Sequence, residues 1–170
     1  MKIRPLWIKF LPPSWVVGVA TLGPVGLWGR APGTSGSIAG IIFYTLFFYS
    51  LGYVSYFIWA ALFIYLGVVF CGEAEVLMQK HDPGEIILDE FVAIPLCFIG
   101  VRPIMDNYPV WIVILLGFVL FRFFDVVKPL GIKRLQKFEG GVGVVADDVA
   151  AALATCVSIH VVFLIWERLF

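Results

Sequence analysis

Residues 36–72 read "GSIAGIIFYTLFFYSLGYVSYFIWAALFIYLGVVFCG", a stretch without a single charged side chain. A membrane-spanning helix needs about 20 consecutive, mostly apolar residues. The stretch is long enough for two such helices. It therefore predicts two spans joined by a turn near Ser50, Leu51 and Gly52.

The whole chain has the composition of a membrane protein. Of its 170 residues, 61% are hydrophobic and only 14% are charged, and the mean hydropathy is +0.99. Soluble domains carry a larger charged share. Further spans are expected at about Ile86 to Val101, Trp111 to Val127 and Val144 to Trp166.

Residues 14–28 are apolar but short, and glycines and Pro24 interrupt them. They predict an interfacial or half-inserted segment ahead of the spans. The fold expected from the sequence is thus all-α: a polytopic membrane helix bundle of about five transmembrane helices, formed by a single domain over residues 1–170.

The charges balance, with 12 Lys plus Arg against 12 Asp plus Glu, so the composition indicates no nucleic-acid partner. Cys71, Cys97 and Cys156 lie in apolar runs without metal-ligand spacing and are read as buried hydrophobes that form no disulfide. No pattern in the sequence indicates an oligomeric state.

The basic residues predict how the chain is oriented. With five spans, one side of the membrane holds Lys2, Arg4, Lys9, Arg30, Lys80, Lys128, Lys133, Arg134 and Lys137. The other side holds only Arg102 and Arg168, and Arg122 falls within the fourth span. Because Lys and Arg stay on the cytoplasmic side of short loops, the first set predicts a cytoplasmic N-terminus.

Four polar motifs interrupt the apolar pattern, all at the cytoplasmic ends of expected spans. They are "RAPGTSGS" (30–37), "HDPGEIILDE" (81–90), "RFFDVVKP" (122–129) and "GGVGVVADD" (140–148). Their convergence at one membrane face is the strongest functional signal in the sequence.

The acids of the second motif have two readings. Asp82 suits a helix N-cap, with Pro83 at the first helical position and Glu85 completing a capping box, so a structural role is as well supported as a catalytic one. Asp89 and Glu90 would lie roughly 10 Å further along such a helix, too deep to cap it. Buried charges of this kind favour a functional role.

The third and fourth motifs carry further acids. Asp125 is expected in the last turn of its helix, where the helix dipole disfavours a carboxylate, although Arg122 and Lys128 at i−3 and i+3 allow a structural ion-pair ladder. Asp147 and Asp148 lie near the start of the last span, where one of them suits the dipole and the pair suggests a site.

The first motif offers small and hydroxyl residues at a helix start. Thr34 and Ser37 among glycines are candidates for a phosphate site, whereas an ordinary cap followed by a small-residue packing face is the alternative. His81 is expected to contact a headgroup or to lie in a solvated loop, and His160 to form an interhelical hydrogen bond.

Several acids gathered at a membrane margin need cations, and carboxylate ligands suit Mg²⁺. Arg122, Lys128 and Arg30 are the natural partners for the remaining phosphate charge. The predicted substrate is a phospholipid with its phosphate in the headgroup plane, which indicates a lipid phosphatase or transferase. A transporter with acidic cation or proton sites is the rival from another class. It would place acids near the bilayer midplane, often in repeated halves, and neither is seen.

The motifs "PGTSGS", "HDPGEIILDEFVA", "FRFFDVVKP" and "GGVGVVADD", in this order, resemble the phosphatidylglycerophosphatase A family of bacterial membrane enzymes. The resemblance implies Mg²⁺-dependent removal of the terminal phosphate of phosphatidylglycerophosphate at the cytoplasmic face of the bacterial inner membrane. A phosphatase or transferase for another lipid phosphate remains the alternative.

The motifs also supply the expected site residues. The catalytic set is Asp82, Asp89, Glu90, Arg122, Asp125 and Asp148. The phosphate-binding set is Arg30, Thr34, Ser37, Arg122 and Lys128. The expected metal ligands are Asp89, Glu90, Asp125, Asp147 and Asp148.

Overall fold

The computed structural model describes residues 5–27, 31–129 and 131–169. Within these residues the chain is helical and forms no strand. The elements are η1 (Leu6–Phe10), α1 (Pro13–Ala20), η2 (Val25–Leu27), α2 (Pro32–Phe43), η3 (Tyr44–Phe48), α3 (Tyr53–Met78), α4 (Leu88–Ala93), η4 (Ile94–Phe98), α5 (Arg102–Asn107), α6 (Val110–Val127), η5 (Ile132–Lys137) and α7 (Gly141–Leu169).

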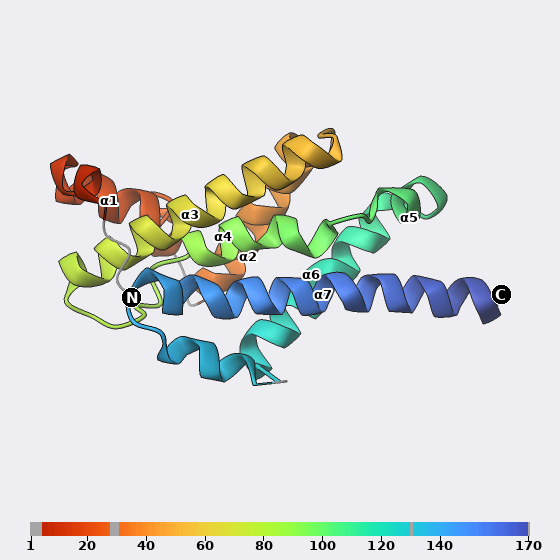
Figure 1. Cartoon of the computed structure of the whole chain (residues 1–170). Coiled ribbons are helices and arrows are strands. Elements are labelled where there is room, and N and C mark those ends of the chain that lie inside the picture. Colours follow the sequence, from red (N-terminus) through yellow and green to blue (C-terminus); the bar gives the residue numbers. More distant parts are fainter. Residues whose placement is uncertain (1–4, 28–30, 130, 170) are drawn as a thin grey trace.

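Among the residues that the structure describes, three helices, α3, α6 and α7, are long and apolar enough to cross a membrane. The longest, α7, packs against both of the others and runs along most of the molecule (Figure 1). The expected helices over 111–127 and 144–166 correspond to α6 and α7. The all-helical membrane bundle predicted from the sequence is confirmed.

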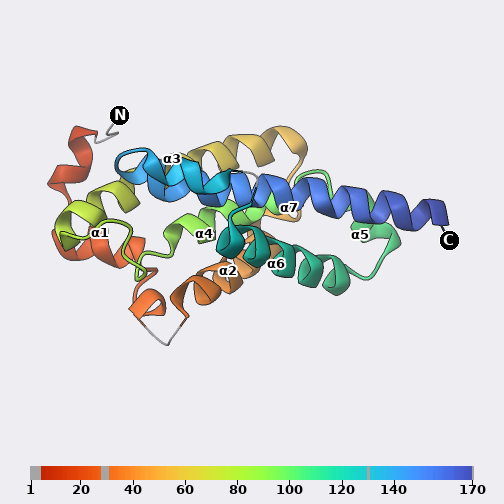
Figure 2. The same cartoon turned by 90° about the horizontal axis from the view of Figure 1, so that it is seen from below.

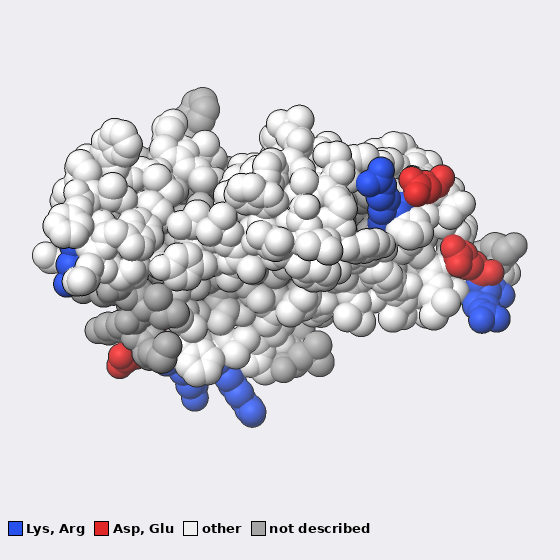
Figure 3. All heavy atoms as spheres, turned by 45° about the horizontal axis from the view of Figure 1, so that its top comes forward, with Lys and Arg blue, Asp and Glu red and all other residues white. Residues whose placement is uncertain are grey.

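The outer faces of these helices are apolar. Phe57 on α3, Val119 on α6 and Leu164 on α7 are each more than half exposed. Figure 3 shows a broad zone without charged side chains between charges gathered near the two ends of the molecule. Such a belt suits contact with lipid chains, since the bilayer core tolerates few charges.

Helix α2 and the π-helical turn η3 form one shorter apolar helix, Pro32–Phe48. The chain then turns through residues 49–52 into α3, where the turn was expected. Gly36 and Gly40 face the α4 region, and a Cβ at Gly40 would lie 2.9 Å from Ile94 Cβ. The small-residue face of α2 thus allows close packing on the buried centre of the bundle.

The continuous helix expected over residues 86–101 is wrong. In its place are the six residues of α4 followed by the five of η4, and all of them are buried except half-buried Phe91. Pro95 lacks a backbone N–H and occupies the start of η4, where a regular α-helix would need that donor. Figure 2 shows α4 inside the bundle, and it contacts α2, α3 and α7. This segment is a core element enclosed by protein.

The segment expected at the interface, residues 14–28, begins with the short helix α1, which packs on α3 through buried Val16 and Ala20. The carbonyl oxygen of Ala20 accepts a hydrogen bond from the Ile87 N–H at 3.0 Å. A Cβ at Gly26 would collide with the Glu85 carbonyl oxygen. The N-terminal region therefore supports the loop that leads into α4.

Candidate active site

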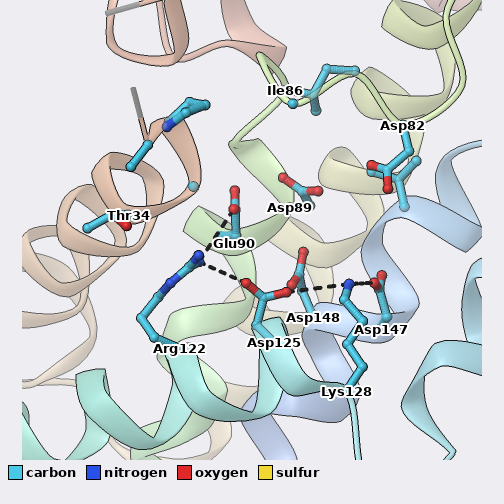
Figure 4. Close-up of a pocket in the computed structure, with 15 residues that line it drawn as sticks. Thr34, Asp82, Ile86, Asp89, Glu90, Arg122, Asp125, Lys128, Asp147 and Asp148 are labelled. Carbon is cyan, nitrogen blue, oxygen red and sulfur yellow. Dashed lines mark hydrogen bonds and ion pairs between the residues drawn. The ribbon is translucent and has the colours of Figure 1, made fainter. Parts of the chain in front are cut away.

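A cavity of about 330 Å³ lies where the four polar motifs meet (Figure 4). The start of α2, the loop before α4 with α4 itself, the end of α6 and the second turn of α7 all contribute to its wall. Its lining residues are Ala31, Pro32, Gly33, Thr34, Asp82, Gly84, Ile86, Asp89, Glu90, Arg122, Asp125, Lys128, Val144, Asp147 and Asp148.

Asp89 and Glu90 enter the cavity from the first turn of α4. They are 6% and 9% exposed, respectively. The helix begins at Leu88 and not near Asp82, so the two acids lie close to its positive end instead of deep within it. The helix dipole offsets part of the cost of burying them. The expectation that the two acids lie roughly 10 Å from the helix start is therefore wrong, because the helix begins next to them.

The capping box expected at Asp82 is absent from the described loop. Asp82 lies in the loop before α4 with a φ of 47°, and the Glu85 carboxylate pairs with Lys80 at 3.0 Å. Asp82 instead contributes to the cavity wall. Partial burial and the negative charge of Asp147 raise the pKa of the Asp82 carboxyl.

The end of α6 supplies the positive charge of the cavity. Arg122 Nη1 lies 2.8 Å from Asp125 Oδ2 and 3.7 Å from Glu90 Oε1. Lys128 Nζ lies 3.5 Å from Asp125 Oδ1 and also pairs with Asp147. The ion-pair ladder that was the alternative reading does form, but it faces the cavity and reaches across to α4 and α7.

Lys128 follows α6 as its C-cap, in a left-handed conformation with a φ of 48°. Burial alone would lower the pKa of its ammonium group, but the carboxylates of Asp147 and Asp125 outweigh this effect and raise the pKa. The lysine therefore stays charged beside the cavity.

Asp147 and Asp148 follow the glycine-rich start of α7 and are 3% and 4% exposed. The close approach of this helix to α3 requires Gly141, because a Cβ there would collide with the Val68 carbonyl oxygen. The glycines thus bring the two acids against α3 and α4, across the cavity from Arg122.

Comparison with known proteins adds an independent observation. The family model described as "Phosphatidylglycerophosphatase A" matches residues 18–163. The chain belongs to the phosphatidylglycerophosphatase A family. The matched region includes all four motifs, and membership makes the chain a phosphatase by class.

Curated relatives agree with the family. A phosphatidylglycerophosphatase A of Haemophilus influenzae is 39% identical over 129 residues, which cover 75% of this chain and 76% of the relative. The Escherichia coli protein of the same name is 34% identical over 129 residues, covering 75% and 72%. A putative phosphatidylinositol-3-phosphatase of Bacteroides thetaiotaomicron is 32% identical over 136 residues, covering 77% and 82%. No solved structure matches the chain.

The cavity of this family member is strongly acidic. Its described lining holds six carboxylates and two cations, a formal charge of −4 when all are ionised. Four buried carboxylate oxygens within the described residues have no hydrogen-bond partner: Asp89 Oδ1, Glu90 Oε2, Asp147 Oδ1 and Asp148 Oδ1. Unpaired buried acids of this kind require compensation by a cation or by protons.

The donor set fits a hard cation in its chemistry, because Mg²⁺ prefers carboxylate oxygens. As placed, however, no three His, Cys, Asp or Glu side chains of the described residues already form a metal site. The acids would have to draw closer around an ion. Asp125 also differs from the other expected ligands, since its two oxygens are paired with Arg122 and Lys128.

The expected phosphate-binding residues separate into groups. Arg122, Lys128 and Thr34 line the cavity. Ser37 does not: it is fully buried, its hydroxyl donates to the Gly33 carbonyl at 2.9 Å, and it accepts a hydrogen bond from Arg122 Nη1 at 3.3 Å. Ser37 thus helps to hold the Arg122 guanidinium without lining the cavity itself. Arg30 lies outside the described residues.

His81 lies in an exposed loop, as one of its two expected readings held, whereas the interhelical hydrogen bond expected of His160 is wrong. His81 Nδ1 lies 2.9 Å from Glu75 Oε1, so this loop residue forms an ion pair when protonated. His160 Nδ1 lies 2.9 Å from the Cys156 carbonyl oxygen, a contact within α7 and not between helices.

Glu75 was missed by the sequence reasoning. It is only 8% exposed at the end of α3, where it also accepts a hydrogen bond from the Asp82 N–H. The sequence offered one signal for a functional role of Glu75, namely its position. Glu73 and Glu75 are the first charged residues after the uncharged run that ends at Gly72.

Proposed function

We propose that the chain removes the terminal phosphate of phosphatidylglycerophosphate, yielding phosphatidylglycerol and phosphate, in a reaction that depends on Mg²⁺. One observation carries the proposal. In a chain of this family, four separate motifs line one cavity, where buried carboxylate oxygens that have no hydrogen-bond partner among the described residues lie beside an arginine and a lysine. The relatives named phosphatidylglycerophosphatase A support the choice of substrate.

The candidate ligands for Mg²⁺ are Asp89, Glu90, Asp147 and Asp148, together with Asp125 if substrate releases it from its ion pairs. In such sites Mg²⁺ supplies charge neutralisation and the activation of water. Excess negative charge in the cavity favours retention of a cation, because like charges in a buried site repel one another.

Arg122 and Lys128 bind the phosphate oxygens in this proposal. Both are already held by carboxylates, so the phosphate has to replace part of the interaction with Asp125 or Asp147. The planar guanidinium of Arg122 suits two oxygens at once, and Ser37 helps to orient it. In this proposal the phosphorus atom lies near the acids whose buried oxygens lack a partner among the described residues.

Asp82 is the proposed proton donor to the oxygen of the departing lipid alcohol. A leaving alkoxide needs a proton, and a carboxyl with a raised pKa retains one closer to neutral pH. Asp82 contributes to the cavity wall from its own loop, opposite the ion-paired end of α6.

The proposed location is the inner membrane of a bacterium, with the cavity open to the cytoplasm. Support comes from the distribution of basic residues: Lys80, Lys128, Lys133, Arg134 and Lys137 belong to the segments that adjoin the cavity, whereas Arg102 and Arg168 do not. The positive-inside rule assigns the more basic loops to the cytoplasm.

A second candidate is hydrolysis of another lipid phosphate. The relative named a putative phosphatidylinositol-3-phosphatase is 32% identical to this chain over 136 residues. Relatives of this chain therefore have names that refer to different lipid headgroups. A cation-coupled transporter is disfavoured because the acids lie in the last turn of α6 and near the start of α7, at the ends of these helices and not at their middle.

Purified protein assayed against a panel of lipid phosphates tests both candidates. We expect the fastest phosphate release from phosphatidylglycerophosphate, loss of turnover in EDTA, and recovery on addition of Mg²⁺. A preference for a phosphoinositide would move the assignment to the second candidate. Full activity in chelator would contradict the metal requirement.

A further inference from the structure

Glu75 lies in the last turn of α3, outside the cavity lining, yet its carboxylate reaches the loop that carries Asp82. We call residues 79–87 the Asp82 loop. Glu75 Oε1 accepts a hydrogen bond from the Asp82 backbone N–H at 2.8 Å and lies 2.9 Å from His81 Nδ1. A single buried oxygen thus contacts two successive residues of the loop.

The Asp82 loop has little regular structure of its own. It leaves α3 through Gln79 with a φ of 53°, and Asp82 also has a left-handed backbone with a φ of 47°. Residues other than glycine adopt this conformation at a cost, so surrounding contacts must maintain it. At the far end of the loop, the Ile87 N–H donates a hydrogen bond to the Ala20 carbonyl oxygen at 3.0 Å.

Near its middle, the loop depends on Glu75. The other hydrogen bond recorded for Asp82 within the described residues runs from Gln136 Nε2 to its carboxylate and is 3.5 Å long. The bond from the Asp82 N–H to Glu75 is shorter and holds the backbone itself, which makes it the stronger restraint on the loop. It fixes the backbone from which the Asp82 side chain joins the cavity wall.

We infer that Glu75 is a positioning residue that holds Asp82 at the cavity by binding its backbone N–H. This inference rests on the proposed function, because it assumes that the Asp82 carboxyl takes part in phosphate release. Glu75 itself need not touch the lipid phosphate. What matters is an acceptor atom at the place of Oε1, and the negative charge is secondary.

Substitutions that keep or remove the acceptor separate these roles. Glu75→Gln keeps an oxygen for the Asp82 N–H and is expected to retain kcat within about twofold. Glu75→Ala removes the acceptor and is expected to lower kcat by about tenfold or more, with KM changed much less. Glu85→Ala is the matched control, since Glu85 belongs to the same loop but pairs with exposed Lys80.

Glu75→Asp gives a second test should the alanine variant fail to fold. It keeps the charge but withdraws the carboxylate by one methylene, so we expect a loss of kcat like that of Glu75→Ala. Retention of full activity by both variants would overturn the inference. Equal loss in Glu75→Gln and Glu75→Ala would also overturn it, because the charge of Glu75 would then matter in its own right.

A double-mutant cycle tests whether Glu75 acts through Asp82. In an Asp82→Asn background, Glu75→Ala should reduce kcat by no more than about twofold, since the group being positioned is already gone. A full additional tenfold loss would mean that Glu75 acts by another route. An Asp82→Asn variant as active as the unmodified enzyme would likewise overturn the inference while leaving phosphatase activity intact.

Hydrogen–deuterium exchange supplies a readout that needs no activity. Amides of the Asp82 loop should exchange faster in Glu75→Ala than in the unmodified protein, while Glu75→Gln and Glu85→Ala stay close to it. Unchanged exchange in Glu75→Ala would refute the contact as a restraint. If the unmodified protein released no phosphate from any lipid, the proposed function would fail, and the exchange result would still decide whether Glu75 restrains the loop.

Discussion

The two sides of the cavity satisfy their charges in different ways. At the end of α6, both oxygens of Asp125 are paired with Arg122 and Lys128. Toward α4 and α7, Asp89, Glu90 and Asp148 each have one buried oxygen with no hydrogen-bond partner among the described residues, although the other oxygen of Glu90 lies 3.7 Å from Arg122 Nη1. Asp147 links the two sides: one of its oxygens pairs with Lys128, and the other has no partner within the same part of the chain.

This difference separates the carboxylate charges that the protein neutralises with its own side chains from those that it leaves for a ligand to neutralise. A buried ion pair is costly to break, because removing one partner strands the other charge. A group of unpaired acids is costly to keep, because burial and mutual repulsion both oppose ionisation. The unpaired side is therefore where a cation would bring the larger gain.

The largest expected effect comes from neutralising one acid on each side. Asp89→Asn and Asp125→Asn should both lower turnover, Asp89→Asn by more than the roughly 10- to 100-fold typical of residues that only support a metal ligand. Their stabilities should move in opposite directions. In EDTA, Asp89→Asn should raise the unfolding temperature by relieving repulsion, whereas Asp125→Asn should lower it by stranding Arg122 and Lys128.

Activity assays and thermal unfolding of both variants in one detergent provide the measurement. The control is the unmodified protein in EDTA and in Mg²⁺. A fully active Asp89→Asn variant would refute the central site assignment. A lower unfolding temperature for both variants would show that the two sides do not differ as described.

The next largest effect is expected at Arg122, on the paired side. Its Nη1 lies near Asp125, Glu90 and the hydroxyl of Ser37. Arg122→Lys keeps the charge but loses the planar fork, which serves several acceptors at once. We expect kcat to fall by about tenfold, the loss of one charge-assisted hydrogen bond. Lys128→Arg is the matched exchange, and similar activity in both variants would mean that charge alone is required.

A smaller effect is expected where α2 approaches the unpaired side. A Cβ at Gly33 would collide with Glu90 Oε1, the flexible end of a side chain, so Gly33→Ala should displace that carboxylate and leave the helices in place. We expect kcat to fall several-fold and the free energy of unfolding to change by no more than about 1 kcal/mol.

Gly18→Ala is the control for Gly33→Ala, because no atom lies within 4 Å of a Cβ placed on that glycine of α1. The two variants are compared by turnover and by chemical unfolding. If both were equally active, the position of the Glu90 carboxylate beside α2 would not matter for the reaction.

Much of this arrangement could be predicted from the sequence, because charge in an apolar chain is easy to locate. The end of α6 at Val127 and the turn after Phe48 follow from runs of uncharged residues and from the residues that end them. The meeting of the four motifs follows from their positions at the ends of spans that share one face. Hydropathy is sufficient for these features.

Hydropathy was insufficient where the surroundings of a residue decide its role. Residues 86–101 are apolar enough for a span, but a segment enclosed by protein needs apolar residues just as one facing lipid does. The helix changes at Pro95, which is visible in the sequence, whereas the contacts with α2, α3 and α7 that enclose the segment are not. Ser37 and Glu75 were misjudged or missed for the same reason. Their partners, Arg122 and the Asp82 N–H, come from other elements and only tertiary structure brings them together.

The smallest expected effect on activity comes from single-cysteine variants. Labelling of these variants tests on which side of the membrane the cavity opens. Gly141 is unsuitable for such a probe, because any side chain there would collide with the Val68 carbonyl oxygen. Exposed Glu139, beside the start of α7, and exposed Asp106, in α5, are better positions. Each cysteine is placed in a background that lacks Cys71, Cys97 and Cys156.

In intact cells, an impermeant thiol reagent should label Asp106→Cys and spare Glu139→Cys, and opening the membrane should make both react. The reason is the basic character of the loops near the cavity, which holds them on the cytoplasmic side. Both variants should keep nearly full turnover, because neither position lines the cavity. The opposite pattern would reverse the orientation, and a lipid phosphate would then have to reach the acids from the outer leaflet.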